Sequence, residues 1–158
     1  MKKRGYKKII YFSLVNILYG FLVSSLLDYF GINESNIGKF KFRNTTQEVF
    51  GSLIISPIFE TIIFQYLIYK IIYSSKVFIQ KFIMNDEDQY LIFYLSVSSI
   101  LFAISHSYSV HYILLMLFPG VIFSYSFYYF KKYDFYPISS VFFIHFSHNL
   151  VALIYDKL

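Results

Sequence analysis

The stretch Ser56–Tyr66, SPIFETIIFQY, lies inside a longer apolar run, Val49–Tyr69, whose only formal charge is Glu60. Because about 20 apolar residues suffice to cross a bilayer, this run predicts a transmembrane helix. Pro57 removes one backbone hydrogen bond from such a helix and can open a kink there. A carboxylate near the helix centre costs at least about 2.5 kcal/mol, so it normally faces a polar cavity or a partner. Glu60 is therefore either a structural residue bonded to a neighbouring helix or part of a buried functional site.

The composition of the whole chain indicates that lipid is its main solvent. Of the 158 residues, 57% are hydrophobic and only 15% are charged, whereas soluble domains average about 25% charged residues. The absence of cysteine excludes both disulfide bonds and thiolate metal sites. The length fits one bundle, so we expect a single membrane domain over residues 1–158. The net charge is +5, and the basic residues lie between the apolar runs. This placement favours contacts to anionic membrane lipid and argues against nucleic acid as a partner.

Five apolar runs predict an all-α fold, a polytopic bundle of transmembrane helices at residues 9–27, 49–69, 90–107, 112–130 and 136–155. The first run is too long for a signal peptide and no small-residue cleavage site follows it, so we expect it to stay in the mature protein. With a cytoplasmic N-terminus, the inner segments carry five, three and two Lys or Arg residues, against four in the outer segments. This asymmetry predicts a multi-pass protein of the cell membrane with its N-terminus in the cytoplasm.

Two further apolar runs carry polar residues at a depth similar to that of Glu60. His106 lies near the end of the third run, and His145 and Asn149 lie one helical turn apart in the fifth. At 1.5 Å per residue, Glu60 lies roughly 16 Å from the outer end of its span and His145 about 14 Å from the inner end. We therefore expect these four side chains to share one layer in the middle or outer half of the membrane.

A glutamate and two histidines from three helices allow two kinds of chemistry. Glu60, His106 and His145 could bind a zinc ion that keeps an open position for water. Alternatively, the glutamate and a histidine could hold a water as general base without any metal. His145 and Asn149 could then donate hydrogen bonds to a developing oxyanion. Each histidine taken alone also fits a helix-contact residue with no catalytic role.

Two other histidines are weaker candidates for this site. His148 follows His145 by three residues, so it could approach the same cavity. His111 lies at or beyond the outer end of the third run, where an interfacial position is expected. Both should tolerate substitution better than His106 or His145.

These polar residues resemble the motifs of the CPBP (CAAX protease and bacteriocin-processing, or Abi) intramembrane proteins, relatives of the eukaryotic prenyl-protein endopeptidase. The three motifs of that family are EExxxR, often preceded by proline, then FxxxH and HxxxN. In this chain they correspond, in order and on separate helices, to Pro57 with Glu60-Thr61-xxx-Gln65, to Phe102–His106 and to His145–Asn149. The resemblance extends from about Val49 to Ile154.

The resemblance implies a role for each matched residue. Glu60 and His106 would activate the attacking water, His145 and Asn149 would form the oxyanion pocket, and Phe102, Thr61 and Gln65 would support the site. Two positions depart from the first motif, since Thr61 replaces its second glutamate and Gln65 replaces its arginine. Thr61 and Gln65 lie at i and i+4 on one helical face, so we expect a neutral hydrogen bond between them.

Three functions follow from the resemblance. The first is an intramembrane endopeptidase that uses a water activated by glutamate and histidine on a membrane-associated peptide or lipoprotein, with bacteriocin immunity or processing as its context. The second is acyl transfer in bacterial lipoprotein N-acylation, in which an amine takes the place of water. The third is a non-catalytic immunity or binding protein. A bacterial membrane suits all three, and zinc is the one cofactor that the residues suggest.

Overall fold

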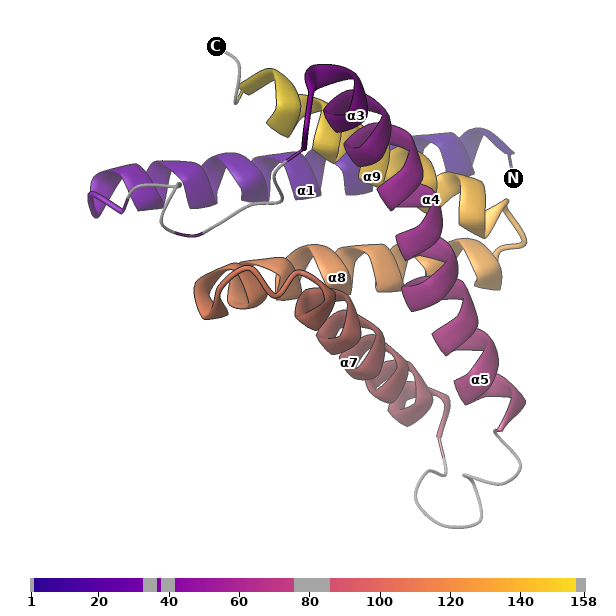
Figure 1. Cartoon of the computed structure of the whole chain (residues 1–158). Coiled ribbons are helices and arrows are strands. Elements are labelled where there is room, and N and C mark those ends of the chain that lie inside the picture. Colours follow the sequence, from indigo (N-terminus) through magenta and orange to yellow (C-terminus); the bar gives the residue numbers. More distant parts are fainter. Residues whose placement is uncertain (1, 33–36, 38–41, 76–85, 156–158) are drawn as a thin grey trace.

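The computed structural model describes residues 2–32, 37, 42–75 and 86–155, which form helices and short connections without a β-strand (Figure 1). Among these residues, five helical segments are long and apolar enough to cross a membrane: Arg4–Tyr29, Thr45–Ser74, Glu87–Ser105, Val110–Lys132 and Pro137–Tyr155. The predicted all-α bundle of about five spans is thereby confirmed.

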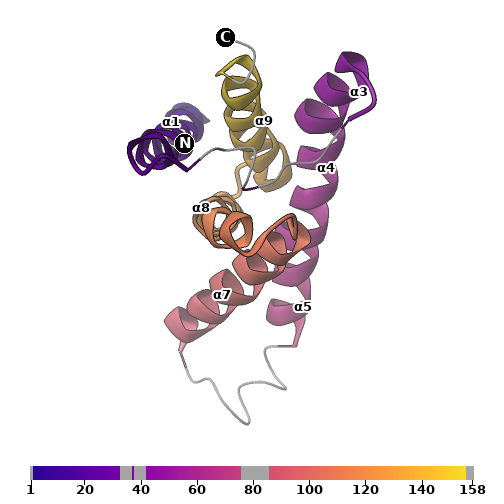
Figure 2. The ribbon, with the colours of Figure 1, turned by 60° about the vertical axis from the view of Figure 1, so that its left-hand side comes forward.

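Four of these segments belong to single α-helices, and α8 contacts the other three. The four are α1 (Lys2–Tyr29), α7 (Glu87–Ser105), α8 (Val110–Lys132) and α9 (Pro137–Tyr155). Helix α8 contacts α1, α7 and α9 as well as the remaining segment. Figure 2 shows α8 with α1 and α9 on one side and α7 on the other. The centre of the fold is therefore α8, around which the other helices are arranged.

The remaining segment, Thr45–Ser74, alternates between α-helix and π-helix. Its parts are α3 (Thr45–Phe50), the π-helix η1 (Gly51–Ile55), α4 (Ser56–Glu60), the π-helix η2 (Thr61–Leu67) and α5 (Ile68–Ser74). At the end of η1, the N–H of Ser56 bonds to the carbonyl of Gly51, five residues earlier. In this register the carbonyl of Ser52 would need the N–H of residue 57, which is a proline and has none. The Ser52 carbonyl must therefore find its donor outside the helix.

Small and aromatic side chains bring α7 and α8 into close contact. A Cβ atom added at Gly120 would lie 3.0 Å from the Cα of Ser99 and 3.2 Å from its carbonyl oxygen. Small residues at such an interface let two transmembrane backbones approach closely. The packed core around this interface is largely aromatic, and its fully buried rings are those of Tyr90, Tyr94, Phe102, Phe123, Phe127 and Phe130.

Side chains of α7 and α8 fix the position of η2. The hydroxyl of Ser98 donates a hydrogen bond to the carbonyl of Phe64 at 2.8 Å and lies 2.5 Å from the hydroxyl of Ser124. The hydroxyl of Tyr94 donates to the carbonyl of Gln65 at 3.2 Å. We call these three side chains and two carbonyls the η2 network. It holds the helix directly after Glu60 in one position.

Helix α1 packs along α9, the last helix of the chain. The hydroxyls of Ser13 and Ser147 lie 3.3 Å apart across this interface. Asn16, one turn further along α1, is fully buried, and neither atom of its side-chain amide has a hydrogen-bond partner in the part of the chain that the structure describes. Tyr19 extends the contact to α8, because its hydroxyl donates to the carbonyl of Leu115 at 2.9 Å.

Candidate active site

Glu60 is the last residue of α4, the single α-helical stretch between η1 and η2. Isolated π-helical turns inside longer helices occur frequently at functional sites. The side chain of Glu60 is 18% exposed, and its buried Oε2 atom has no hydrogen-bond partner among the residues that the structure describes. The carboxylate that the sequence singles out is therefore not held by a direct hydrogen bond, and its near neighbours are two imidazoles.

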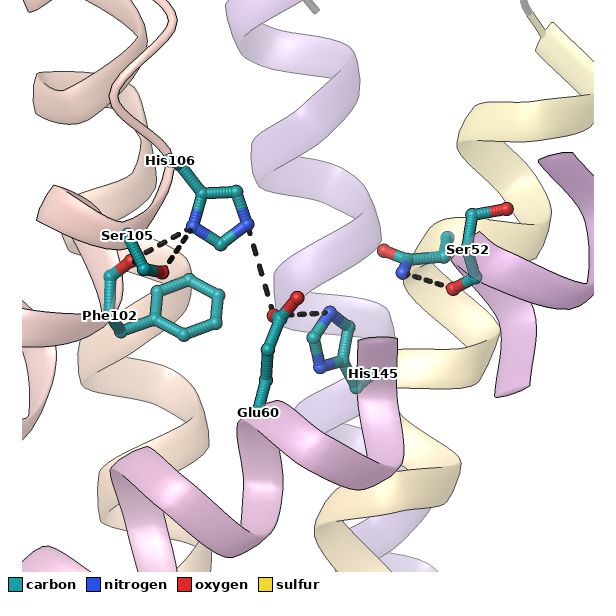
Figure 3. Close-up of polar contacts among 7 residues, drawn as sticks. Ser52, Glu60, Phe102, Ser105, His106 and His145 are labelled. Carbon is teal, nitrogen blue, oxygen red and sulfur yellow. Dashed lines mark hydrogen bonds and ion pairs between the residues drawn. The ribbon is translucent and has the colours of Figure 1, made fainter. Parts of the chain in front are cut away.

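His106 lies just beyond the end of α7, not within the third span as we expected. It is the C-cap residue, with φ −97° and ψ 44°, and its N–H bonds to the carbonyl of Ala103. Its Nδ1 atom lies 2.8 Å from the carbonyl oxygen of Phe102. A carbonyl can only accept, so a hydrogen bond at this distance places the proton on Nδ1 in the neutral ring. The Nε2 atom then presents a lone pair, and it is the atom that faces Glu60 (Figure 3).

His145 approaches Glu60 from α9. It is buried, and its ring stacks on that of Phe123 with the centroids 4.3 Å apart. Its Nδ1 atom has no hydrogen-bond partner among the described residues, whereas Nε2 faces the carboxylate of Glu60. Phe102 lies beside both imidazoles, with ring centroids 4.7 Å from His106 and 6.0 Å from His145. Aromatic rings therefore pack against both imidazoles, and Phe102 contacts the two of them.

The two imidazoles converge on one carboxylate oxygen. The Nε2 atom of His106 lies 3.8 Å and that of His145 lies 3.7 Å from Oε2 of Glu60, as Figure 3 shows. Both distances exceed the 2.7–3.2 Å range of a direct N–H···O hydrogen bond. They are well within the reach of one bridging water. The structure thus brings together the glutamate and the two histidines that sequence depth placed in one layer.

Asn149 has a partner that the sequence analysis did not foresee. Its Nδ2 atom donates to the carbonyl of Ser52 at 2.7 Å. This is the carbonyl that η1 and Pro57 leave without a backbone donor. Asn149 therefore completes the hydrogen bonding of the second segment from α9. The sequence contains the cause of this contact, a proline five residues after Ser52. The proline leaves the Ser52 carbonyl without a backbone donor only if the helix follows the i to i+5 pattern, which the sequence does not reveal.

Thr61 and Gln65 do not form the expected hydrogen bond with one another. Both side chains are fully buried, and within the described part of the chain the Thr61 hydroxyl and both amide atoms of Gln65 lack hydrogen-bond partners. The expectation assumed an α-helix, in which residues i and i+4 lie on one face. The two residues belong instead to η2, whose wider turn follows an i to i+5 pattern. This prediction was wrong because the helix type differs from the one assumed.

The other two histidines lie away from Glu60. His148 faces α1, since its Cε1 atom would lie 3.4 Å from a Cβ added at Gly20. His111, in the first turn of α8, is exposed, as expected for an interfacial residue. Tyr112 is a neighbour of the site that no motif indicated, and its ring lies 6.0 Å from that of His106.

The residues considered as zinc ligands do not fit that role as their side chains lie. Within the described part of the chain, no group of three or more His, Cys, Asp or Glu residues is arranged to hold a metal ion. Glu60, His106 and His145 meet at one oxygen instead of surrounding a common point.

Comparison with known families agrees with the motifs. The family model for type II CAAX prenyl endopeptidases of the Rce1-like kind matches residues 43–151. No curated protein and no solved structure matches the chain. The matched region includes Glu60, His106, His145 and Asn149, and it confirms the resemblance to CAAX proteases. The chain therefore belongs to the Rce1-like family of type II CAAX prenyl endopeptidases.

Proposed function

We propose that this protein hydrolyses a peptide bond in a membrane-associated peptide or lipoprotein with a water activated by Glu60 and His106. Membership of the Rce1-like family supports a CAAX-protease-like intramembrane endopeptidase. The observation that carries the proposal is the convergence of two imidazole Nε2 atoms on Oε2 of Glu60, at 3.8 and 3.7 Å. A general base must lie within hydrogen-bond reach of the proton that it removes, or reach it through one water.

The proposed reaction begins at the carboxylate of Glu60. It takes one proton from the water, whose oxygen attacks the carbonyl carbon of the scissile bond. The lone pair on Nε2 of His106 accepts a hydrogen bond from the second hydrogen of the same water. When the carbon–nitrogen bond breaks, protonated Glu60 gives its proton to the departing amine. The products are a carboxylic acid and an amine, so one water is consumed for each bond cleaved.

The negative charge that develops on the carbonyl oxygen needs donors. We assign this role to the N–H of His145 and to the second hydrogen of the Asn149 amide. A carboxamide carries two donor hydrogens, and the bond to Ser52 uses only one of them. Losing one donor of such a pocket typically reduces the rate by about 10²–10³-fold. In this proposal Asn149 both supports the second segment and contributes to catalysis.

The membrane setting follows from the five apolar segments. We propose that the N-terminus lies in the cytoplasm of a bacterial cell, as the distribution of Lys and Arg indicates. The native chain contains no cysteine, so single introduced cysteines can report the orientation. A membrane-impermeant maleimide should label a cysteine at exposed Asp134 only from the cytoplasmic side and one at exposed Val110 only from outside. The reverse pattern would contradict the orientation.

The activity can be tested with the purified protein in lipid nanodiscs. The probe is a fluorogenic peptide that ends in a prenylated cysteine followed by three residues, the substrate class named by the family. Cleavage in water enriched in ¹⁸O should place one labelled oxygen in the new carboxylate, which distinguishes hydrolysis from acyl transfer to an amine. Glu60→Gln should abolish cleavage, and Asp28→Asn, which removes an exposed carboxylate outside the site, should not. Equal cleavage by wild type and Glu60→Gln would overturn the proposal.

A further inference from the structure

A groove with no residue in common with the Glu60 site opens where three helices meet. It has a volume of about 490 Å³, within the range of pockets that hold small ligands. It lies between η2 and α5, the last turns of α8 and the first turn of α9. The residues that line it are Tyr66, Tyr69, Lys70, Tyr73, Ser74, Phe127, Lys131, Pro137 and Ile138.

The walls of the groove are aromatic. The rings of Tyr69 and Tyr73 stack with their centroids 4.3 Å apart, and that of Tyr69 lies 5.4 Å from Phe127. Pro137 and Ile138 add apolar surface from the start of α9. Such walls suit a hydrocarbon chain better than a hydrated solute.

The rim of the groove is cationic. Lys70 and Lys131 are both exposed, and no acidic residue is among those that line the groove. The ammonium of Lys70 lies 6.0 Å from the ring centroid of Tyr66, so its charge is held over the aromatic wall. Two cations above an apolar groove are complementary to an amphiphile with an anionic head.

The groove also lies at one membrane face. Successive spans alternate in direction, so the end of α5, the end of α8 and the start of α9 share a face with the N-terminal end of α1. That face carries the basic residues of the N-terminal head together with Lys70, Lys131 and Lys132. In the proposed orientation it is the cytoplasmic leaflet, where anionic lipids attract basic segments.

We infer that this groove is a binding site for an anionic glycerophospholipid. The phosphate lies between Lys70 and Lys131, and the upper part of one acyl chain packs against Tyr66, Tyr69 and Phe127. Each lysine facing the anionic head should strengthen binding about fivefold. The site is independent of the peptidase chemistry, because no residue of the proposed reaction lines it.

Bromolipid quenching of a single tryptophan tests the inference. The chain contains no tryptophan, so Ile138→Trp, at the exposed rim, provides one local reporter. In nanodiscs of phosphatidylcholine, brominated phosphatidylglycerol should quench this reporter at a several-fold lower mole fraction than brominated phosphatidylcholine. Adding Lys70→Ala or Lys131→Ala should weaken that preference about fivefold each. Circular dichroism of every variant checks that the fold is kept.

Lys132→Ala is the matched control. Lys132 is exposed and adjacent to Lys131, but its ammonium lies 5.7 Å from the Tyr128 ring and it does not line the groove. The preference for brominated phosphatidylglycerol over brominated phosphatidylcholine should be unchanged in this variant. Equal quenching by the two lipids would overturn the inference, and an equal loss in Lys132→Ala and Lys131→Ala would show unspecific surface charge. Displacement of the bromolipid by soluble glycerol phosphate would show a phosphate site in place of a lipid site.

Discussion

Two polar regions lie next to one another on the second segment, and they differ in how their hydrogen-bonding groups are satisfied. In the η2 network, the carbonyls of Phe64 and Gln65 receive hydroxyl donors from α7. One turn earlier, Oε2 of Glu60 faces two imidazoles at 3.8 and 3.7 Å, but neither it nor Nδ1 of His145 has a hydrogen-bond partner among the described residues. Buried polar groups are normally paired. Because two imidazoles also converge on this carboxylate, we expect the second region to bind a water or a substrate. The η2 network holds the helix in position, whereas the groups around Glu60 are available to bind a reactant.

The largest effect is expected from removing an imidazole from the region around Glu60. His106→Ala should lower the turnover number about 10²–10⁴-fold, the usual contribution of a positioned acid or base. Its melting temperature should change little, since the ring makes few buried hydrogen bonds. His111→Ala, at an exposed position on the next helix, is the control and should retain full activity. Equal turnover in the two variants would mean that the region around Glu60 is not catalytic.

A second prediction concerns the η2 network. Ser98→Ala would remove the hydroxyl that donates to the partly buried Phe64 carbonyl, which should lower the free energy of unfolding by about 1–3 kcal/mol. Turnover should fall as well, because η2 follows Glu60 directly. Unfolding in detergent with increasing denaturant measures the loss. Ser96→Ala, at an exposed position on the same helix, should be neutral. A loss of activity without any loss of stability would contradict the structural role of the η2 network.

The contact between Asn149 and Ser52 lies outside both regions but combines a paired backbone carbonyl with a side chain of the proposed site, so it sharpens the comparison. Asn149→Ala should lower the free energy of unfolding by about 1 kcal/mol, because the Ser52 carbonyl loses its donor. In a Pro57→Ala background, residue 57 regains an N–H and the same substitution should cost less. The double-mutant cycle should therefore give a coupling of at least about 0.5 kcal/mol. Additive losses would show that the proline is not the reason why Ser52 needs Asn149.

The smallest effect is expected at Thr61. Its hydroxyl is fully buried without a partner, so Thr61→Val removes a polar atom and keeps the shape. The free energy of unfolding should stay the same or rise by less than about 1 kcal/mol. Thr46→Val, at an exposed position in α3, gives the background effect of the same change. A loss above that background would mean that the hydroxyl has a partner in the membrane.

The sequence predicted the features that depend on hydropathy and depth. The five apolar runs correspond to the five long helical segments, and Glu60, His106 and His145 meet, as their approximate positions along the spans predicted. Hydrogen-bond register is not encoded in hydropathy, so the two π-helices could not be foreseen. The wrong expectation for Thr61 and Gln65 and the unforeseen partner of Asn149 both follow from that register. The end of α7 before His106 was missed for a related reason, since Ser105, His106 and Ser107 carry no charge that would mark a boundary.

The pairing of α1 with α9 has a consequence for the order in which the protein assembles. Ser13 and Ser147, which meet across this interface, are separated by 134 positions in the chain. At a synthesis rate of about 5–20 residues per second, α1 is inserted on the order of ten seconds before α9 exists. During that interval Asn16, fully buried in the finished fold, has only lipid, nascent helices or an insertion factor as neighbours. Biogenesis of this bundle should therefore depend on whatever shields α1 until the last helix enters the membrane.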